Sequence, residues 1–118
     1  MESAPKIIHL ARARSEHELT QANDTFERLR IQHENAGVLY RAAEHTFLGL
    51  RTYIFHSENF SKLPEQRQYL LRLQYQSALA HLNKMLDALS KTEDAFLDAK
   101  KQADTALQVV KNIDGVPE

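Results

Sequence analysis

The amino-acid sequence predicts an all-α protein, an antiparallel hairpin of two long helices packed as a coiled coil. Two stretches of the chain carry apolar residues at alternating steps of three and four, and a polar segment separates them. A hydrophobic repeat of 3.5 residues keeps one side of a helix facing a partner helix over many turns. Two such stretches joined by a short loop are therefore expected to fold back on each other.

The first stretch runs from Leu19 to Ile54, and we call its repeating positions the first seam. The first seam consists of Leu19, Ala22, Phe26, Leu29, His33, Ala36, Tyr40, Ala43, Phe47, Leu50 and Ile54. His33 is its one polar member, and a polar residue on a seam commonly fixes the register or the oligomeric state. A hydrogen-bonded core histidine is the first interpretation. The alternative is a pH switch, in which protonation weakens assembly below about pH 6.

The first helix is expected to cover about residues 5–56. Pro5 suits a first helical turn, where a missing amide proton costs nothing. The segment Ser15-Glu-His-Glu18 matches the capping-box pattern that starts helices. However, Ile8 and Ser15 keep the phase of the first seam, which favours one continuous helix through this segment.

The second stretch runs from Leu71 to Ile113, and its repeating positions form the second seam, with Thr92 as the one polar member. The second seam consists of Leu71, Tyr75, Ala78, Leu82, Met85, Leu89, Thr92, Phe96, Ala99, Ala103, Ala106, Val110 and Ile113. Pro64 can open this helix, for the same reason as Pro5. The second helix is expected to cover about residues 64–113, followed by a short C-terminal tail.

The segment between the seams is expected to form the hairpin loop. Residues 57–63, Ser-Glu-Asn-Phe-Ser-Lys-Leu, are polar and rich in residues that favour turns. Within this segment, Phe60 and Leu63 can close the loop end of the core. The result is a single helical hairpin domain over residues 1–118.

Folding the chain about this loop predicts which seam residues face each other. The expected pairs have residue numbers that sum to about 121 or 122, with bulky and small layers alternating. They include Phe47 with Tyr75, Ala43 with Ala78, Tyr40 with Leu82, His33 with Leu89, and Phe26 with Phe96.

Apolar residues outside the seams indicate a second interface, because two helices alone would leave them in water. The interface candidates are Leu79, Leu86 and Leu107 on the second helix, with Ile31, Val38 and Leu39 as weaker candidates on the first, where Leu48 and Phe55 also lie outside the seam. The simplest solution is a homodimer, in which two hairpins pair about a two-fold axis into a four-helix bundle. The alternative is that another helical protein supplies the missing helices. Gly37 and Gly49 would permit a close approach of such a partner.

The sequence offers no grouping that predicts catalysis, a cofactor or a metal site. It contains no cysteine, and its six histidines show no metal-ligand spacing. Inward positions carry no carboxylate for acid–base chemistry, and no glycine-rich phosphate loop is present. The protein is therefore not expected to be an enzyme.

The overall charge and hydropathy bound the classes of partner. The formal net charge of −1 gives no bulk attraction to nucleic acid or to an anionic membrane. No stretch approaches the roughly 20 apolar residues that span a bilayer. We therefore expect neither partner, and take the cytoplasm as the default location.

The expected function is protein binding through a coiled-coil surface, as an adaptor, chaperone or assembly factor. In its two long antiparallel helices the chain resembles the rod-like stalk proteins of flagellar and type III secretion apparatuses. That resemblance implies the alternative function, a structural rod or stalk in a larger assembly. No specific family motif is recognised.

Overall fold

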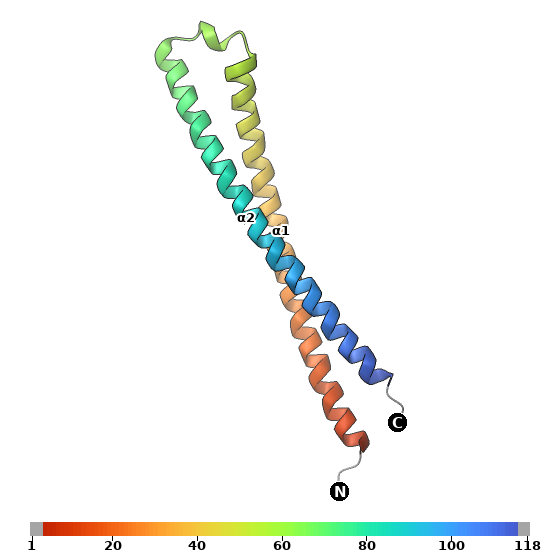
Figure 1. Ribbon diagram of the computed structural model, residues 1–118. Helices are drawn as coiled ribbons and strands as arrows, with labels where there is room; N and C mark the ends of the chain where they lie inside the picture. The colour runs from red at the N-terminus through yellow and green to blue at the C-terminus, as the bar shows by residue number, and fades with distance from the viewer. Residues whose placement is uncertain (1–3, 116–118) are drawn as a thin grey trace. The chain divides into compact units, whose positions relative to one another are not determined.

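The structure of the protein is a computed structural model that describes residues 4–115, with side chains from Ile7 onward. Helix α1 covers Ala4–His56 and helix α2 covers Glu65–Asp114. The loop between them contains one 3-10 turn, η1, over Phe60–Lys62, and the described residues contain no strand (Figure 1). The predicted all-α hairpin of two packed helices is confirmed.

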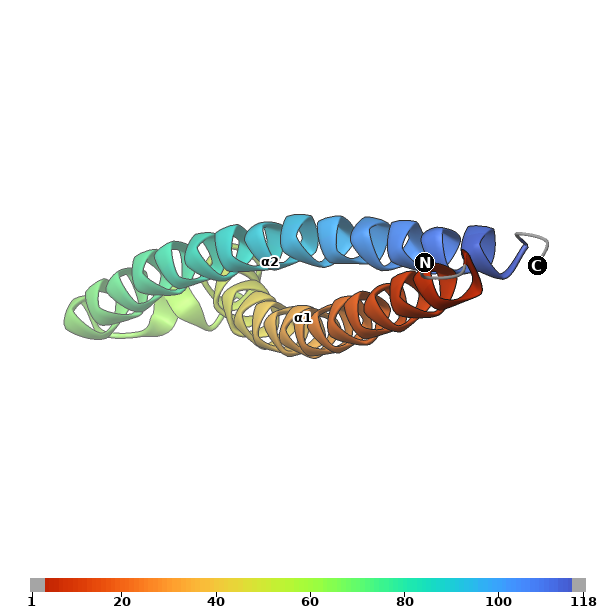
Figure 2. The ribbon, with the colours of Figure 1, turned by 90° about the horizontal axis from the view of Figure 1, so that it is seen from below.

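The hairpin divides into two compact units. The loop unit comprises residues 33–92, and the terminal unit comprises residues 1–32 and 93–118. Within each unit an α1 segment lies alongside an α2 segment and runs in the opposite direction (Figures 1 and 2). The expectation of a single domain over residues 1–118 stays a prediction, and the expected tail beyond residue 115 lies outside the described residues.

The ends of the helices follow local backbone chemistry. Helix α1 is continuous through Ser15, as the phase of the first seam favours. Helix α2 begins directly after Pro64, whose carbonyl oxygen accepts hydrogen bonds from the amides of Arg67 and Gln68 at 2.9 and 3.0 Å. Pro64 thus caps α2 from the position before its first turn, where the missing amide proton of proline is harmless.

Burial confirms the two seams position by position. Every seam residue is buried or half-buried, including the two polar ones. The buried hydrophobic side chains are Ala43, Ile54, Phe60, Ala99 and Ala103. None of the large side chains described is fully enclosed. Two helices cover only one side of each other, so the core is a narrow strip.

Aromatic contacts confirm two of the predicted seam pairs, one in each unit. In the loop unit the rings of Phe47 and Tyr75 stack with centroids 5.2 Å apart. In the terminal unit Phe26 and Phe96 stack at the same distance. Stacked aromatic pairs add specificity beyond the area that they bury.

The hydrogen bond of His33 reaches one seam step beyond its predicted partner, Leu89. The Nδ1 atom of His33 lies 3.2 Å from the Oγ1 atom of Thr92, so the two polar seam residues meet each other. In coiled-coil packing each side chain fits between successive seam residues of the other helix. Residue numbers alone leave open which of those neighbours is contacted.

The loop closes the core with a buried aromatic ring, as predicted for Phe60. This ring is 6% exposed and packs edge-on against Tyr53, with centroids 6.2 Å apart. The guanidinium carbon of Arg72 lies 5.5 Å from the centre of the same ring. The side-chain amide of Gln68 donates a hydrogen bond to the carbonyl oxygen of Leu63 at 2.9 Å. These contacts tie the loop to α2.

Candidate interaction surface

The described residues present surfaces for binding and no grouping for metal chemistry. Within residues 4–115, no cluster of three or more His, Asp or Glu side chains could hold a metal ion. A search of the same residues found no helix with the length and apolar character to cross a membrane. The functional question therefore rests on polar groups in the seam and on apolar groups outside it.

The hydrogen bond between His33 and Thr92 fits a role in fixing the register. The hydroxyl of Thr92 donates its proton to the carbonyl oxygen of Leu89 at 2.9 Å, so its oxygen accepts the bond from His33 Nδ1. An N–H at Nδ1 is present in one neutral tautomer and in the protonated ring. The contact therefore lends no specific support to the alternative of a pH switch.

The six residues predicted for a second interface are exposed but do not share one surface. Their exposed fractions range from 38% at Leu79 to 57% at Leu39. Leu79 and Leu86 lie seven residues apart on the same side of α2. By helical spacing, Ile31 and Val38 lie on the side of α1 opposite the first seam. Leu39 borders that seam on its other edge.

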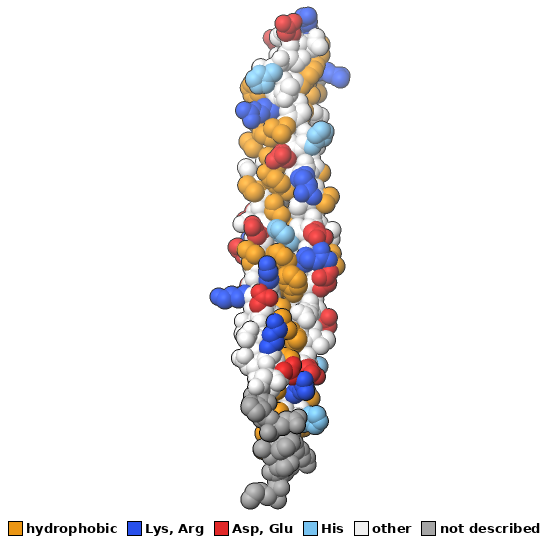
Figure 3. Space-filling model, turned by 90° about the vertical axis from the view of Figure 1, so that its right-hand side faces the viewer, with side chains coloured by type: hydrophobic (Ala, Val, Ile, Leu, Met, Phe, Trp, Pro, Cys, Tyr) orange, Lys and Arg blue, Asp and Glu red, His pale blue; other side chains and the backbone are white. Residues whose placement is uncertain are grey.

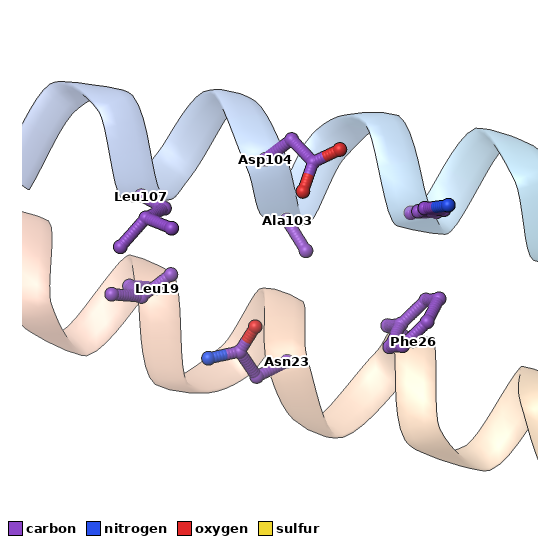
Figure 4. Close-up of a pocket in the computed structure, with 7 residues that line it drawn as sticks. Leu19, Asn23, Phe26, Ala103, Asp104 and Leu107 are labelled. Atoms are coloured by element: carbon purple, nitrogen blue, oxygen red, sulfur yellow. The ribbon is translucent and has the colours of Figure 1, made fainter.

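Leu107 contributes to packing within the terminal unit. Its side chain points towards Leu19 of α1, and both border an open cavity of about 250 Å³ (Figure 4). The cavity is lined by Leu19, Asn23, Phe26, Lys100, Ala103, Asp104 and Leu107. The partially exposed Leu107 thus also faces α1 of its own hairpin.

An apolar surface in the loop unit combines exposed residues of both helices. The ring of Phe55 on α1 packs edge-on against Tyr75 of α2, with centroids 5.6 Å apart. Leu79 follows Tyr75 by one turn, and Leu48 precedes Phe55 by two turns, so the two rows share one side of the hairpin. We call the exposed residues Leu48, Phe55, Leu79 and Leu86 the loop-unit flank.

Hydrophobic side chains reach the molecular surface across the part of the chain that includes the loop. On the face drawn in Figure 3 they gather towards the loop end, with Lys, Arg, Asp and Glu side chains scattered between them. Exposed apolar residues that adjoin one another mark interaction sites more often than isolated ones do.

Charged residues accompany the loop-unit flank along α1. In order they are Glu34, Arg41, Glu44 and Arg51, alternating in sign. The hydrogen bond from the Tyr40 hydroxyl to Glu44 raises the pKa of Tyr40. These side chains can pair with charges on a docked helix and so select its position.

Neither glycine inside α1 is required by the packing of the hairpin itself. A methyl group at Gly37 would meet only Leu89 Cδ1 and Arg41 Nη1, both at 3.9 Å. A methyl group at Gly49 would meet no atom within 4 Å. Glycine costs about 1 kcal/mol relative to alanine in a helix interior. A role in contact with another chain stays a prediction for both residues.

The sequence predicted Leu79 and Leu86 as interface candidates but not the side of the hairpin that they share with Leu48 and Phe55. That side becomes visible only through the contact between Phe55 and Tyr75. Comparison with known proteins found no matching family model, no similar curated protein and no similar solved structure. The function is therefore argued from the surface.

Proposed function

We propose that the chain is a non-enzymatic protein-interaction module, acting as an adaptor, chaperone or assembly factor, which binds helices through the loop-unit flank. The observation that carries this proposal is the exposure of Leu48, Phe55, Leu79 and Leu86 on one side of a hairpin with few buried side chains. Two further helices laid against this flank would complete a four-helix bundle. A second copy of the chain or another helical protein can supply them.

The test places charges on the flank and measures the mass of the protein in solution. We expect Leu79→Glu with Leu86→Glu to abolish assembly, because a carboxylate cannot be buried without a partner. The matched control is Leu70→Glu with Leu73→Glu, two exposed leucines of α2 on other sides of the helix. Light scattering should find the control at the parent's mass and the flank variant at a lower mass.

Circular dichroism checks that both variants keep the helicity of the parent, since all four positions are exposed. A flank variant that stays helical and keeps the parent's mass would refute the assignment of this surface.

A further inference from the structure

We propose that the loop-unit flank binds a second copy of this chain in the antiparallel orientation, with the loops of the two hairpins at opposite ends. This inference rests on the proposed function, because it names the occupant of the same surface. A two-fold axis would cross α1 between Ala42 and Ala43 and cross α2 between Leu82 and Asn83. The leucines of α2 and the charged residues of α1 separately point to this position.

The contact between His33 and Thr92 shows which residues of the two helices lie level. Ala43 follows His33 on α1 by as many residues as Leu82 precedes Thr92 on α2. Because His33 and Thr92 are in contact, Ala43 and Leu82 lie level with each other. An axis perpendicular to the helices that passes beside Ala43 therefore also passes beside Leu82. The position on one helix fixes the position on the other.

On α2 this axis pairs the two leucines of the flank. An antiparallel two-fold contact is reciprocal, so residues equally distant from the axis on opposite sides meet across it. Leu79 then faces Leu86 of the copy, and Leu86 faces its Leu79. The leucines of the flank thus form an apolar contact at the centre of the interface.

On α1 the same axis pairs opposite charges. Arg41 faces Glu44 of the copy, and by symmetry Glu44 faces its Arg41. Further out, Glu34 and Arg51 face each other in the same way. The charged residues of α1 were not used to place the axis on α2. The pairing of their opposite charges across the axis is therefore an independent observation.

A further pair on α1 joins a side chain with a glycine. Leu48, which is 44% exposed, faces Gly37 of the copy. Gly37 presents no side chain, so the leucine of the copy would enter a recess bordered by Leu89 and by the guanidinium of Arg41. This contact explains why a glycine that the hairpin does not need stands inside α1.

Shifting the copy along the helices by one heptad is penalised in both directions. A shift one way sets Arg41 against Arg51 of the copy and Leu86 against its Arg72. A shift the other way sets Glu34 against Glu44 of the copy. Like charges in contact disfavour both alternatives.

The experiment uses two full-length variants with opposite charge changes. Arg41→Glu with Arg51→Glu makes all four charged residues of α1 at the interface acidic. Glu34→Arg with Glu44→Arg makes all four basic. We expect each variant alone to self-associate at least about 100-fold more weakly than the parent. An equimolar mixture should restore assembly at twice the chain mass of 13.6 kDa, because every pair is then again of opposite sign.

Light scattering gives the mass, and a distinguishing tag on one variant shows that the restored species is mixed. The matched control is Lys84→Glu, an exposed charge change on another side of α2, which should leave the parent's mass unchanged. Each variant should keep the parent's helicity.

The outcomes separate this inference from the proposed function. If the leucine variant dissociates but either charge variant still dimerises alone, or the mixture fails to assemble, the antiparallel arrangement is overturned while the flank remains the interface. A parent that is monomeric at every concentration overturns the second copy as the occupant. If the parent is oligomeric and the leucine variant keeps the parent's mass, the proposed function itself fails.

Discussion

The loop unit and the terminal unit use the same two helices but differ in what they place beside the seams. In the terminal unit an ion pair joins Arg12 to Asp114 across the two helices, and Arg12 also lies 3.4 Å from Glu16. In the loop unit the positions beside the seams include Leu79 and Leu86, which are exposed. The terminal unit thus has an ion pair between its two helices beside the seams, where the loop unit has exposed leucines.

The two units also differ in their balance of charged residues and in how their ends are closed. The terminal unit carries eleven Asp and Glu residues against eight Lys and Arg, and the loop unit carries five against seven. The loop unit is closed at its end by the buried ring of Phe60. Each unit contains an open cavity, which lies beside Leu19 and Leu107 in the terminal unit and beside Leu48 and Tyr53 in the loop unit.

The largest effect is expected at the aromatic closure. Phe60→Ala should lower the free energy of unfolding by about 3 kcal/mol, because it removes a buried ring and its contacts with Tyr53 and Arg72. Phe26→Ala, at a half-buried ring of the terminal unit, should cost about half as much. Urea unfolding at one chain concentration measures both. Equal losses would remove the distinction between the units.

Two alanines of the second seam should respond in opposite ways to added volume. Ala99 is 4% exposed, and Ala99→Leu should cost about 1–3 kcal/mol through overpacking. Ala103 borders the cavity of the terminal unit, so Ala103→Leu can fill that space and should raise stability by up to about 1 kcal/mol. Thermal unfolding compares them, and a loss of similar size at Ala103 would show that the cavity is not available to a larger side chain.

The polar pair at the boundary of the loop unit is expected to cost stability. His33→Leu should raise the free energy of unfolding by about 1 kcal/mol, as replacing a polar seam residue does in coiled coils. Helicity and mass should depend on pH in the same way in the variant and the parent, because an N–H at Nδ1 that can donate to Thr92 is present in one neutral tautomer and in the protonated ring. A parent that dissociates on acidification while the variant does not would instead establish the pH switch.

The two glycines of α1 provide a matched pair on the loop unit. Gly49→Ala and Gly37→Ala should each stabilise the hairpin by about 0.5–1 kcal/mol, since both sites accommodate a methyl group. Only Gly37→Ala should also weaken assembly, because it fills the recess that receives Leu48 of the copy. Unfolding and light scattering separate the two effects. Equal assembly of both variants would argue against the recess.

The smallest effect concerns an exposed ion pair of the terminal unit. The hydrogen bond from Arg30 holds the pKa of Glu27 below its usual range. A carboxyl whose pKa is lowered by folding stabilises the protein above its unfolded pKa, and this contribution is lost as the pH falls through the folded pKa. Glu27→Gln should therefore be slightly less stable than the parent at neutral pH. The two unfolding curves should converge below about pH 4.

The spacing of apolar residues was sufficient to predict the hairpin and the face that each helix buries. Every seam residue is at least half-buried, and the loop closes at Phe60 as expected. Spacing is sufficient here because a 3.5-residue period by itself determines which side of the helix each side chain occupies. Small errors in helix ends do not affect that result.

The relative level of the two helices could not be predicted from spacing. One seam step separates the expected partner of His33, Leu89, from the observed one, Thr92, and both satisfy the periodicity. The signal that distinguishes them is chemical, because the two polar members of the seams satisfy each other. For the same reason, spacing could not predict that Leu79 and Phe55 share one side of the hairpin or that Leu107 faces Leu19. Both depend on how far one helix is shifted along the other, as well as on the side of the helix that each residue occupies.

The most direct test of the central claim is the mass of the unmodified chain, measured by light scattering across a concentration series at neutral pH. If the loop-unit flank pairs with a second copy, the mass should be twice 13.6 kDa and should fall towards the monomer only at the lowest concentrations. A mass of 13.6 kDa at every concentration would contradict the account.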